Sequence, residues 1–163
     1  MSFVHLHLHT HYSFLQGLGN PEDFVMRAKE LGMPALAITD TNNLHGAFEF
    51  YLLCKKKDIK PIIGIEVFIC EQGQTYDARD AKVYSLILLA KNFKGYKNLI
   101  YLTTNAYLGG NVGNRPQIDF PLLEQYATDI IALSGDLTSE LAQHIVSGRD
   151  DTFLLERHDE WRA

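Results

Sequence analysis

Four histidines alternate with apolar residues near the start of the chain, in the stretch Val4-His5-Leu6-His7-Leu8-His9-Thr10-His11. A period of two is typical of a β-strand, with the apolar side chains on one face and the imidazoles on the other. Same-face neighbours lie roughly 7 Å apart, so two imidazoles can converge on one ion through bonds of about 2.0–2.1 Å. The alternative is a polar strand face with solvated histidines. The repeated alternation favours a metal site centred on His7 and His9.

Three carboxylates lie in or just after other predicted strands. Asp40 and Asp136 each follow a short apolar run, whereas Glu66 lies inside one. The carboxyl ends of barrel strands form one face, where active sites are built, so we expect all three as further metal ligands. A carboxylate buried without a partner is costly. Glu66 should therefore contact a metal, a cation or hydrogen-bond donors, unless it faces the surface.

Apolar periodicity and capping residues predict strands that alternate with helices, which implies a parallel sheet or barrel. In the second helix we expect Phe48, Tyr51 and Leu52 to face inward. About five predicted strands are too few for a closed eight-stranded barrel. We therefore expect an incomplete barrel with open edges and marginal stability. The predicted strands are 4–11, 35–39, 62–69, 83–90 and 129–134, and the predicted helices are 21–31, 44–57, 96–107, 121–126 and 138–146.

Length and composition limit the class of protein. A chain of 163 residues suits one domain, and its net charge of −5 argues against a broad basic surface for nucleic acid. Cys54 and Cys70 match no zinc or redox spacing and predict free thiols in a cytoplasmic protein. No apolar run is long enough to span a membrane. The Lys55-Lys56-Lys57 run is interpreted as the solvated end of a helix, with a nucleic-acid patch as the alternative.

Several longer stretches resemble one known family. They are HLHLHTHYS at 5–13, LGMPALAITDTNNLHGAFEFY at 31–51, IKPIIGIEVFI at 59–69, LLAKNFKGYKNL at 88–99 and ALSGDLTSELAQ at 132–143. This pattern is similar to the PHP (polymerase and histidinol phosphatase) domain, in the form that opens the alpha subunits of bacterial DNA polymerase III. The resemblance implies an α/β fold, a distorted (β/α)7 TIM-like barrel, of which this chain would supply about the first five units. We expect a partial PHP domain over residues 1–149 and a divergent C-terminal tail over 150–163.

The resemblance also implies a metal site. His7 and His9 match the paired histidine ligands of the family, and Glu66 matches the carboxylate that bridges two ions. Active members hold up to three ions and hydrolyse phosphoesters, in some polymerases as a proofreading exonuclease. At three positions where the family has stronger ligands this chain has Gln16, Thr41 and Ser85, and Asp136 stands where the family often has Cys. Gln, Thr and Ser are poor ligands for transition metals.

The expected function is therefore that of a PHP portion of the replicative polymerase, which acts in DNA replication mainly as a metal-binding or structural scaffold. The full-length protein would be a DNA-directed DNA polymerase, although this chain lacks the palm domain. The alternative is a stand-alone metal-dependent phosphoesterase or 3'-5' exonuclease of the same family. The expected cofactor is a divalent metal in a partial site, with zinc and manganese as first candidates and magnesium as a further one. The expected partners are the rest of the polymerase, the proofreading exonuclease subunit and, indirectly, DNA.

Overall fold

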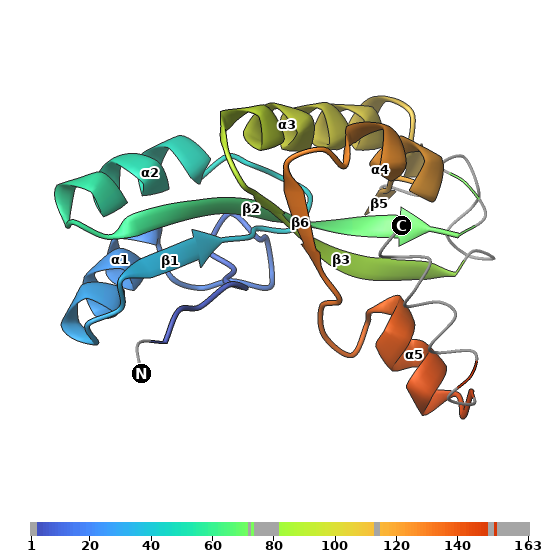
Figure 1. Cartoon of the computed structure of the whole chain (residues 1–163), viewed down its shortest axis with the longest axis horizontal. Coiled ribbons are helices and arrows are strands. Elements are labelled where there is room, and N and C mark those ends of the chain that lie inside the picture. Colours follow the sequence, from blue (N-terminus) through green and yellow to red (C-terminus); the bar gives the residue numbers. More distant parts are fainter. Residues whose placement is uncertain (1–2, 72, 74–81, 113–114, 150–151, 153–163) are drawn as a thin grey trace.

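The computed structural model describes residues 3–71, 73, 82–112, 115–149 and 152 (Figure 1). Most of the predicted tail 150–163 lies outside these residues, so it stays a prediction. The helices are α1 Pro21–Glu30, α2 Ala47–Lys56, α3 Phe93–Leu108, α4 Phe120–Tyr126 and α5 Glu140–Val146. The strands are β1 Ala35–Ile38, β2 Lys60–Cys70, β3 Val83–Ala90, β4 Asn111–Val112, β5 Arg115–Pro116 and β6 Ile130–Leu133.

The helices begin where polar side chains cap them. Asn20 accepts a hydrogen bond from the Asp23 amide (2.9 Å), and Pro21 occupies the first turn of α1, as the sequence predicts. Asn92, Asp119 and Ser139 cap α3, α4 and α5 in the same way. Among the described helices none is long and apolar enough to cross a membrane.

The main sheet is open and mixed, with the strand order β1-β2-β3-β6. The parallel sheet that we expected is confirmed only for β1 and β2, because β2–β3 and β3–β6 pair antiparallel. The register pairs Cys70 with Val83, so the chain turns back on itself after β2, as in a hairpin. That this open sheet is the incomplete part of a distorted (β/α)7 barrel stays a prediction. A short antiparallel β4–β5 pair lies between α3 and α4, where no strand was predicted.

The histidine segment, residues 4–11, runs beside β1 but is not the regular strand that we predicted. The amide of Ala37 donates to the carbonyl of His5 (3.0 Å), and the amide of Thr39 donates to the carbonyl of Leu8 (2.9 Å). Between these two bonds the segment advances by three residues, whereas β1 advances by two. The segment therefore contains one extra residue, as in a β-bulge. The extra residue interrupts the strict alternation, and Leu6 is left 39% exposed.

Three hydrophobic clusters hold the described elements together, and the two larger ones involve the helices. One joins α3 to β2 and β3, and the other joins α1 and α2 to β1. The prediction that Phe48, Tyr51 and Leu52 face inward is wrong, since they are 71%, 42% and 50% exposed while Phe50 and Cys54 of the same helix are fully buried. Helix α2 carries apolar residues on two faces, so periodicity alone could not select the buried one.

Candidate metal centre

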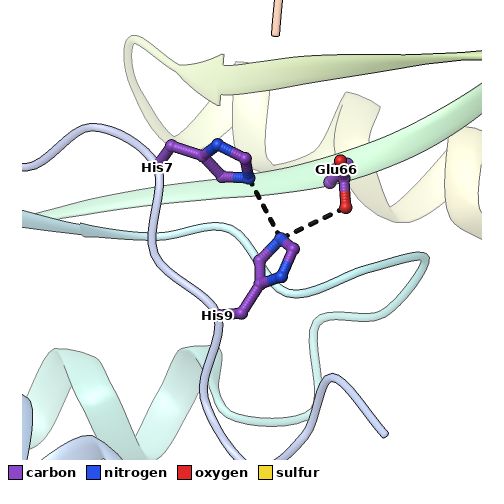
Figure 2. A group of neighbouring side chains, drawn as sticks. All are labelled: His7, His9 and Glu66. Atoms are coloured by element: carbon purple, nitrogen blue, oxygen red, sulfur yellow. Dashed lines mark hydrogen bonds and ion pairs between the residues drawn. The ribbon is translucent and has the colours of Figure 1, made fainter. Parts of the chain in front are cut away.

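Three side chains converge beyond the carboxyl end of β1. The Nε2 atoms of His7 and His9 lie 3.0 Å apart, and the His9 Nε2 lies 3.1 Å from the Glu66 Oε2. The potential ligand atoms of the three residues all lie within 4.8 Å of one another. Figure 2 shows both imidazoles extending from the histidine segment toward the carboxylate on β2.

Backbone pairing explains how residues so distant in sequence meet. Past the last residue of β1, the amide of Glu66 donates to the carbonyl of Asp40 (3.2 Å), and the amide of Asn42 donates to the carbonyl of Glu66 (2.8 Å). These bonds place Glu66 opposite Thr41, which lies three residues beyond the end of β1. The histidine segment follows β1 on its other edge, so His7 and His9 reach across the end of that strand.

Asp40 is only 2% exposed, and its oxygens are occupied by hydrogen-bond donors. One oxygen accepts from the amide of Thr10 (2.7 Å) and from the Ser13 hydroxyl, and the other accepts from the Thr10 hydroxyl (2.8 Å). Its predicted role as a metal ligand stays a prediction. These bonds give it a second role, because they fix the end of the histidine segment to the end of β1. Sequence reasoning overlooked Thr10 and Ser13, although both lie in the matched His-Thr-His-Tyr-Ser stretch.

Asp136 lies after β6 and is exposed. One of its oxygens accepts hydrogen bonds from the backbone amide and the hydroxyl of Thr138 (2.7 Å each), and these bonds lower the pKa of Asp136. Its negative charge acts on His7 and His9, since it favours their protonated forms. It is not part of the three-residue group. Ligation by Asp136 therefore stays a prediction, and its electrostatic action on the site is supported.

The three substituted family positions also have defined contacts. The Thr41 hydroxyl lies 2.9 Å from the Glu66 Oε2 and 2.5 Å from the Gln16 Oε1. Ser85 is buried, and its hydroxyl lies 2.7 Å from the Thr138 hydroxyl. Gln16, Thr41 and Glu66 therefore form a contiguous polar group, in which the one Thr41 hydroxyl proton can be donated to either oxygen but not to both. This direct partnership between Thr41 and Glu66 was not foreseen from the sequence.

The electrostatics of the group separate its two histidines. The hydrogen bond with Glu66 raises the pKa of His9, although burial opposes this shift. Burial and the neighbouring His9 lower the pKa of His7. Burial alone would raise the pKa of Glu66, but hydrogen bonds with His9 and Thr41 and the histidine charges lower it overall. Glu66, only 5% exposed, thus has the donor partners that its place in an apolar strand requires.

Proton counting favours a cation in this group. A neutral imidazole nitrogen carries either a proton or a lone pair. If the His9 Nε2 carries the proton that bonds Glu66, it cannot also accept from the His7 Nε2, so one of the two short contacts is left without a hydrogen bond. A divalent ion would resolve this conflict, because two nitrogen lone pairs and one carboxylate could bind it. Imidazole and carboxylate ligands suit zinc and manganese.

The other histidines near the site do not join it. His5 packs edge-on against Phe3 with ring centroids 4.7 Å apart, and His11 packs against Tyr12 at 4.3 Å. His45 lies 6.4 Å from the Tyr12 ring. In the described part of the chain, the group that can hold an ion consists of His7, His9 and Glu66.

Comparisons with known proteins place the chain in a family. The PHP domain matches residues 5–162. The DNA polymerase III alpha subunit of Treponema pallidum is 40% identical over 153 residues, which cover 91% of this chain and 13% of that protein. The corresponding subunit of Chlamydia pneumoniae is 43% identical over 160 residues, which cover 96% of this chain and 13% of that protein. The chain therefore spans about an eighth of the length of these relatives.

A solved structure of an amidohydrolase from Chromobacterium violaceum is 21% identical, with a TM-score of 0.48 over 65% of this chain and 34% of that one. The sequence relationships are much stronger than this structural one. They agree with the resemblance that the histidine segment and the later motifs predicted. The chain belongs to the PHP domain family and is homologous to the N-terminal region of DNA polymerase III alpha subunits.

Proposed function

We propose that this chain acts in DNA replication as the PHP portion of a bacterial DNA polymerase III alpha subunit, mainly as a metal-binding structural scaffold. The proposal is supported by family membership and by 40–43% identity to two such subunits. Its partners would be the remainder of the polymerase, the proofreading exonuclease subunit and, through them, DNA. Nucleotidyl transfer would belong to other parts of the polymerase.

The observation that carries the metal-binding part is the convergence of His7, His9 and Glu66, with their ligand atoms within 4.8 Å of one another. These three residues would hold one divalent transition ion, with zinc and manganese as first candidates. We propose that Asp40 contributes chiefly by positioning the histidine segment, because its oxygens already accept from Thr10 and Ser13. Asp136 would contribute chiefly through its charge, as an added attraction for a cation.

The scaffold role is favoured over phosphoester hydrolysis by the chemistry of the neighbouring positions. Hydrolysis in this family relies on clustered ions that activate water and bind the developing charge from two sides. Gln16 and Thr41 have weakly coordinating side chains, and Thr41 contacts both Gln16 and Glu66. Ser85 instead lies against Thr138. With one well-formed ligand group in the described residues, we expect one ion and negligible turnover.

Elemental analysis tests the metal site. The purified chain, loaded with zinc or manganese and desalted, should retain close to one equivalent, and His7→Ala/His9→Ala should retain almost none. His5→Ala/His11→Ala is the matched control, because it also removes two imidazoles from the same segment while sparing the proposed ligands. Equal metal content in the wild type and in His7→Ala/His9→Ala would contradict the proposal.

A phosphodiester assay separates the scaffold from the alternative. Labelled single-stranded DNA with manganese should remain intact in the presence of the purified chain. Turnover that rises with protein concentration and disappears in Glu66→Gln would replace the scaffold role with that of a phosphoesterase or 3'-5' exonuclease.

A further inference from the structure

A groove of about 500 Å³ separates α2 from the start of α3. Figure 1 shows both helices along the same side of the sheet, with the end of α2 that begins at Ala47 nearest to α3. Pro61 and Ile63 of β2 and Ala90 of β3 also line it. The groove shares no residue with the metal centre.

Four aromatic side chains line the walls, two from each helix. They are Phe48 and Tyr51 of α2 and Phe93 and Tyr96 of α3. Phe48 is 71% exposed, Phe93 70% and Tyr51 42%. The residues on each helix are three positions apart, so each pair shares one helix face. Phe48 and Tyr51 belong to one of the two apolar faces of α2, and this face borders the open groove.

Lysines accompany the rings on both walls. The Lys55 ammonium lies 5.7 Å from the centre of the Tyr51 ring, and the Lys97 ammonium lies 5.1 Å from the centre of the Phe93 ring. Lys91 lines the groove itself. Lys56 and Lys57 follow Lys55 at the end of α2. In a chain of net charge −5, this is a local concentration of positive charge next to exposed aromatic rings.

Two of the acidic side chains nearby have partners of their own, and exposed Asp58 directly follows the lysine run. Glu49 of α2 accepts a hydrogen bond from the Tyr12 hydroxyl at 3.1 Å. Asp129 accepts from Asn92 at 2.9 Å and lies 3.9 Å from the Lys94 ammonium. The groove walls therefore present rings and cations, a combination suited to a ligand that is flat, stackable and negatively charged.

We propose that this groove binds single-stranded nucleic acid. Bases would stack on the exposed rings of Phe48 and Phe93, and the phosphate backbone would lie along the lysines of α2 and α3. Aromatic platforms flanked by basic side chains bind single strands in this way, largely without sequence preference. An apolar protein segment would gain from the rings but would have to desolvate the lysines, so the charge favours a polyanion. The proposal is independent of the metal centre and of the scaffold role.

Fluorescence anisotropy with the full 163-residue chain and a labelled thymidine oligonucleotide of about twelve nucleotides tests this inference. At low salt we expect saturable binding, weakened about tenfold by Phe48→Ala and again by Phe93→Ala, since stacking on one ring is worth about 1–3 kcal/mol per base. Phe14→Ala is the matched control, because Phe14 is 85% exposed at another site and its removal should change nothing. Circular dichroism confirms that each variant is folded.

A salt series and a backbone-only oligonucleotide complete the test. Lys55→Ala/Lys97→Ala removes two proposed phosphate contacts. Each contact to a single strand contributes roughly 0.7 to the slope of the logarithm of the association constant against the logarithm of the salt concentration, so this slope should become shallower by about 1.4. Lys29→Ala on α1 is the charge control. Addition of a chelator should leave binding unchanged, which separates this site from the metal centre. Absence of binding, equal binding of an abasic strand, or wild-type affinity in both aromatic variants would overturn the proposal.

Discussion

Replacing Asp40 with alanine should destabilise the metal-free protein, because this carboxylate connects the histidine segment to β1. Asp40 is 2% exposed and accepts hydrogen bonds from the Thr10 amide, the Thr10 hydroxyl and the Ser13 hydroxyl. In Asp40→Ala all three donors lose their acceptor, and the buried Thr10 amide has no water to replace it. A residue whose role is metal ligation alone would behave differently, since its removal should leave the metal-free fold unchanged.

The expected loss follows from these contacts. A hydrogen bond to a charged group contributes about 1.5–3 kcal/mol, and an unsatisfied buried donor costs about 1–3 kcal/mol. Relief from burying a charge offsets part of the loss. We expect Asp40→Ala to cost about 3–5 kcal/mol, which is roughly a 10 °C lower Tm for a chain of this size. Asp40→Asn keeps one oxygen acceptor and the side-chain shape, so it should cost about 1–2 kcal/mol.

Thermal melts in excess chelator, followed by circular dichroism, measure this loss. Asp136→Ala is the matched control: its carboxylate is exposed, so its removal should cost less than about 1 kcal/mol. Metal titrations of the same variants should show weaker binding by Asp40→Ala with unchanged stoichiometry. A metal-free melt of Asp40→Ala that matches the wild type, together with a lower metal stoichiometry, would contradict this role of Asp40.

Three further outcomes are expected from the packing and the pKa shifts. Phe50→Ala should lower the free energy of unfolding by about 3–5 kcal/mol and Phe48→Ala by less than about 0.5 kcal/mol, because the Phe50 ring is fully buried and the Phe48 ring is 71% exposed. Similar losses for both variants in denaturant melts would mean that α2 is oriented differently. Burial raises the pKa of the Cys54 thiol to about 12, so a thiol reagent at pH 8 should modify it only after denaturation, and rapid native labelling seen by mass spectrometry would contradict this. The hydrogen bond with Glu66 raises the pKa of His9 above its ordinary 6.5, so that pairing stabilises the metal-free fold below pH 6.5 and is lost as pH rises through the raised value. Glu66→Gln should therefore lower the Tm more at pH 6 than at pH 9 in chelator, and equal losses at both pH values would show that the pairing is absent.

The sequence predicted the elements of the fold better than their arrangement. Caps such as Asn20 and apolar runs such as β2 are local signals, and they placed the described helices and main strands within a few residues. The direction of β3 was missed, because alternating helices and strands suggested a crossover where the chain instead turns back between Cys70 and Val83. The orientation of α2 was missed for a similar reason, since which apolar face is buried depends on neighbours distant in sequence.

The candidate site was predictable where residue chemistry is unusual. Alternating imidazoles and a carboxylate inside an apolar strand identified His7, His9 and Glu66, and the structure brings the three together. It could not be predicted that Asp40 would be surrounded by donors from Thr10 and Ser13, because that depends on how the segment bends after His9. The extra residue in the histidine segment opposite β1 could not be predicted either, because a strict alternation of apolar and polar residues implies a regular strand.

The two sides of the metal centre differ in how extensively their backbones are hydrogen-bonded, and they should therefore differ in how easily they open locally. Glu66 belongs to β2, which is paired on both edges, whereas His7 and His9 belong to a segment that meets β1 through scattered hydrogen bonds. The segment should therefore open more readily than the sheet. An ion shared by both sides would act as a removable cross-link, and at 100 times its Kd it would suppress opening about 100-fold. Amide hydrogen exchange at Leu8 and Thr10 should slow by that factor on metal addition, while exchange within β3 stays unchanged.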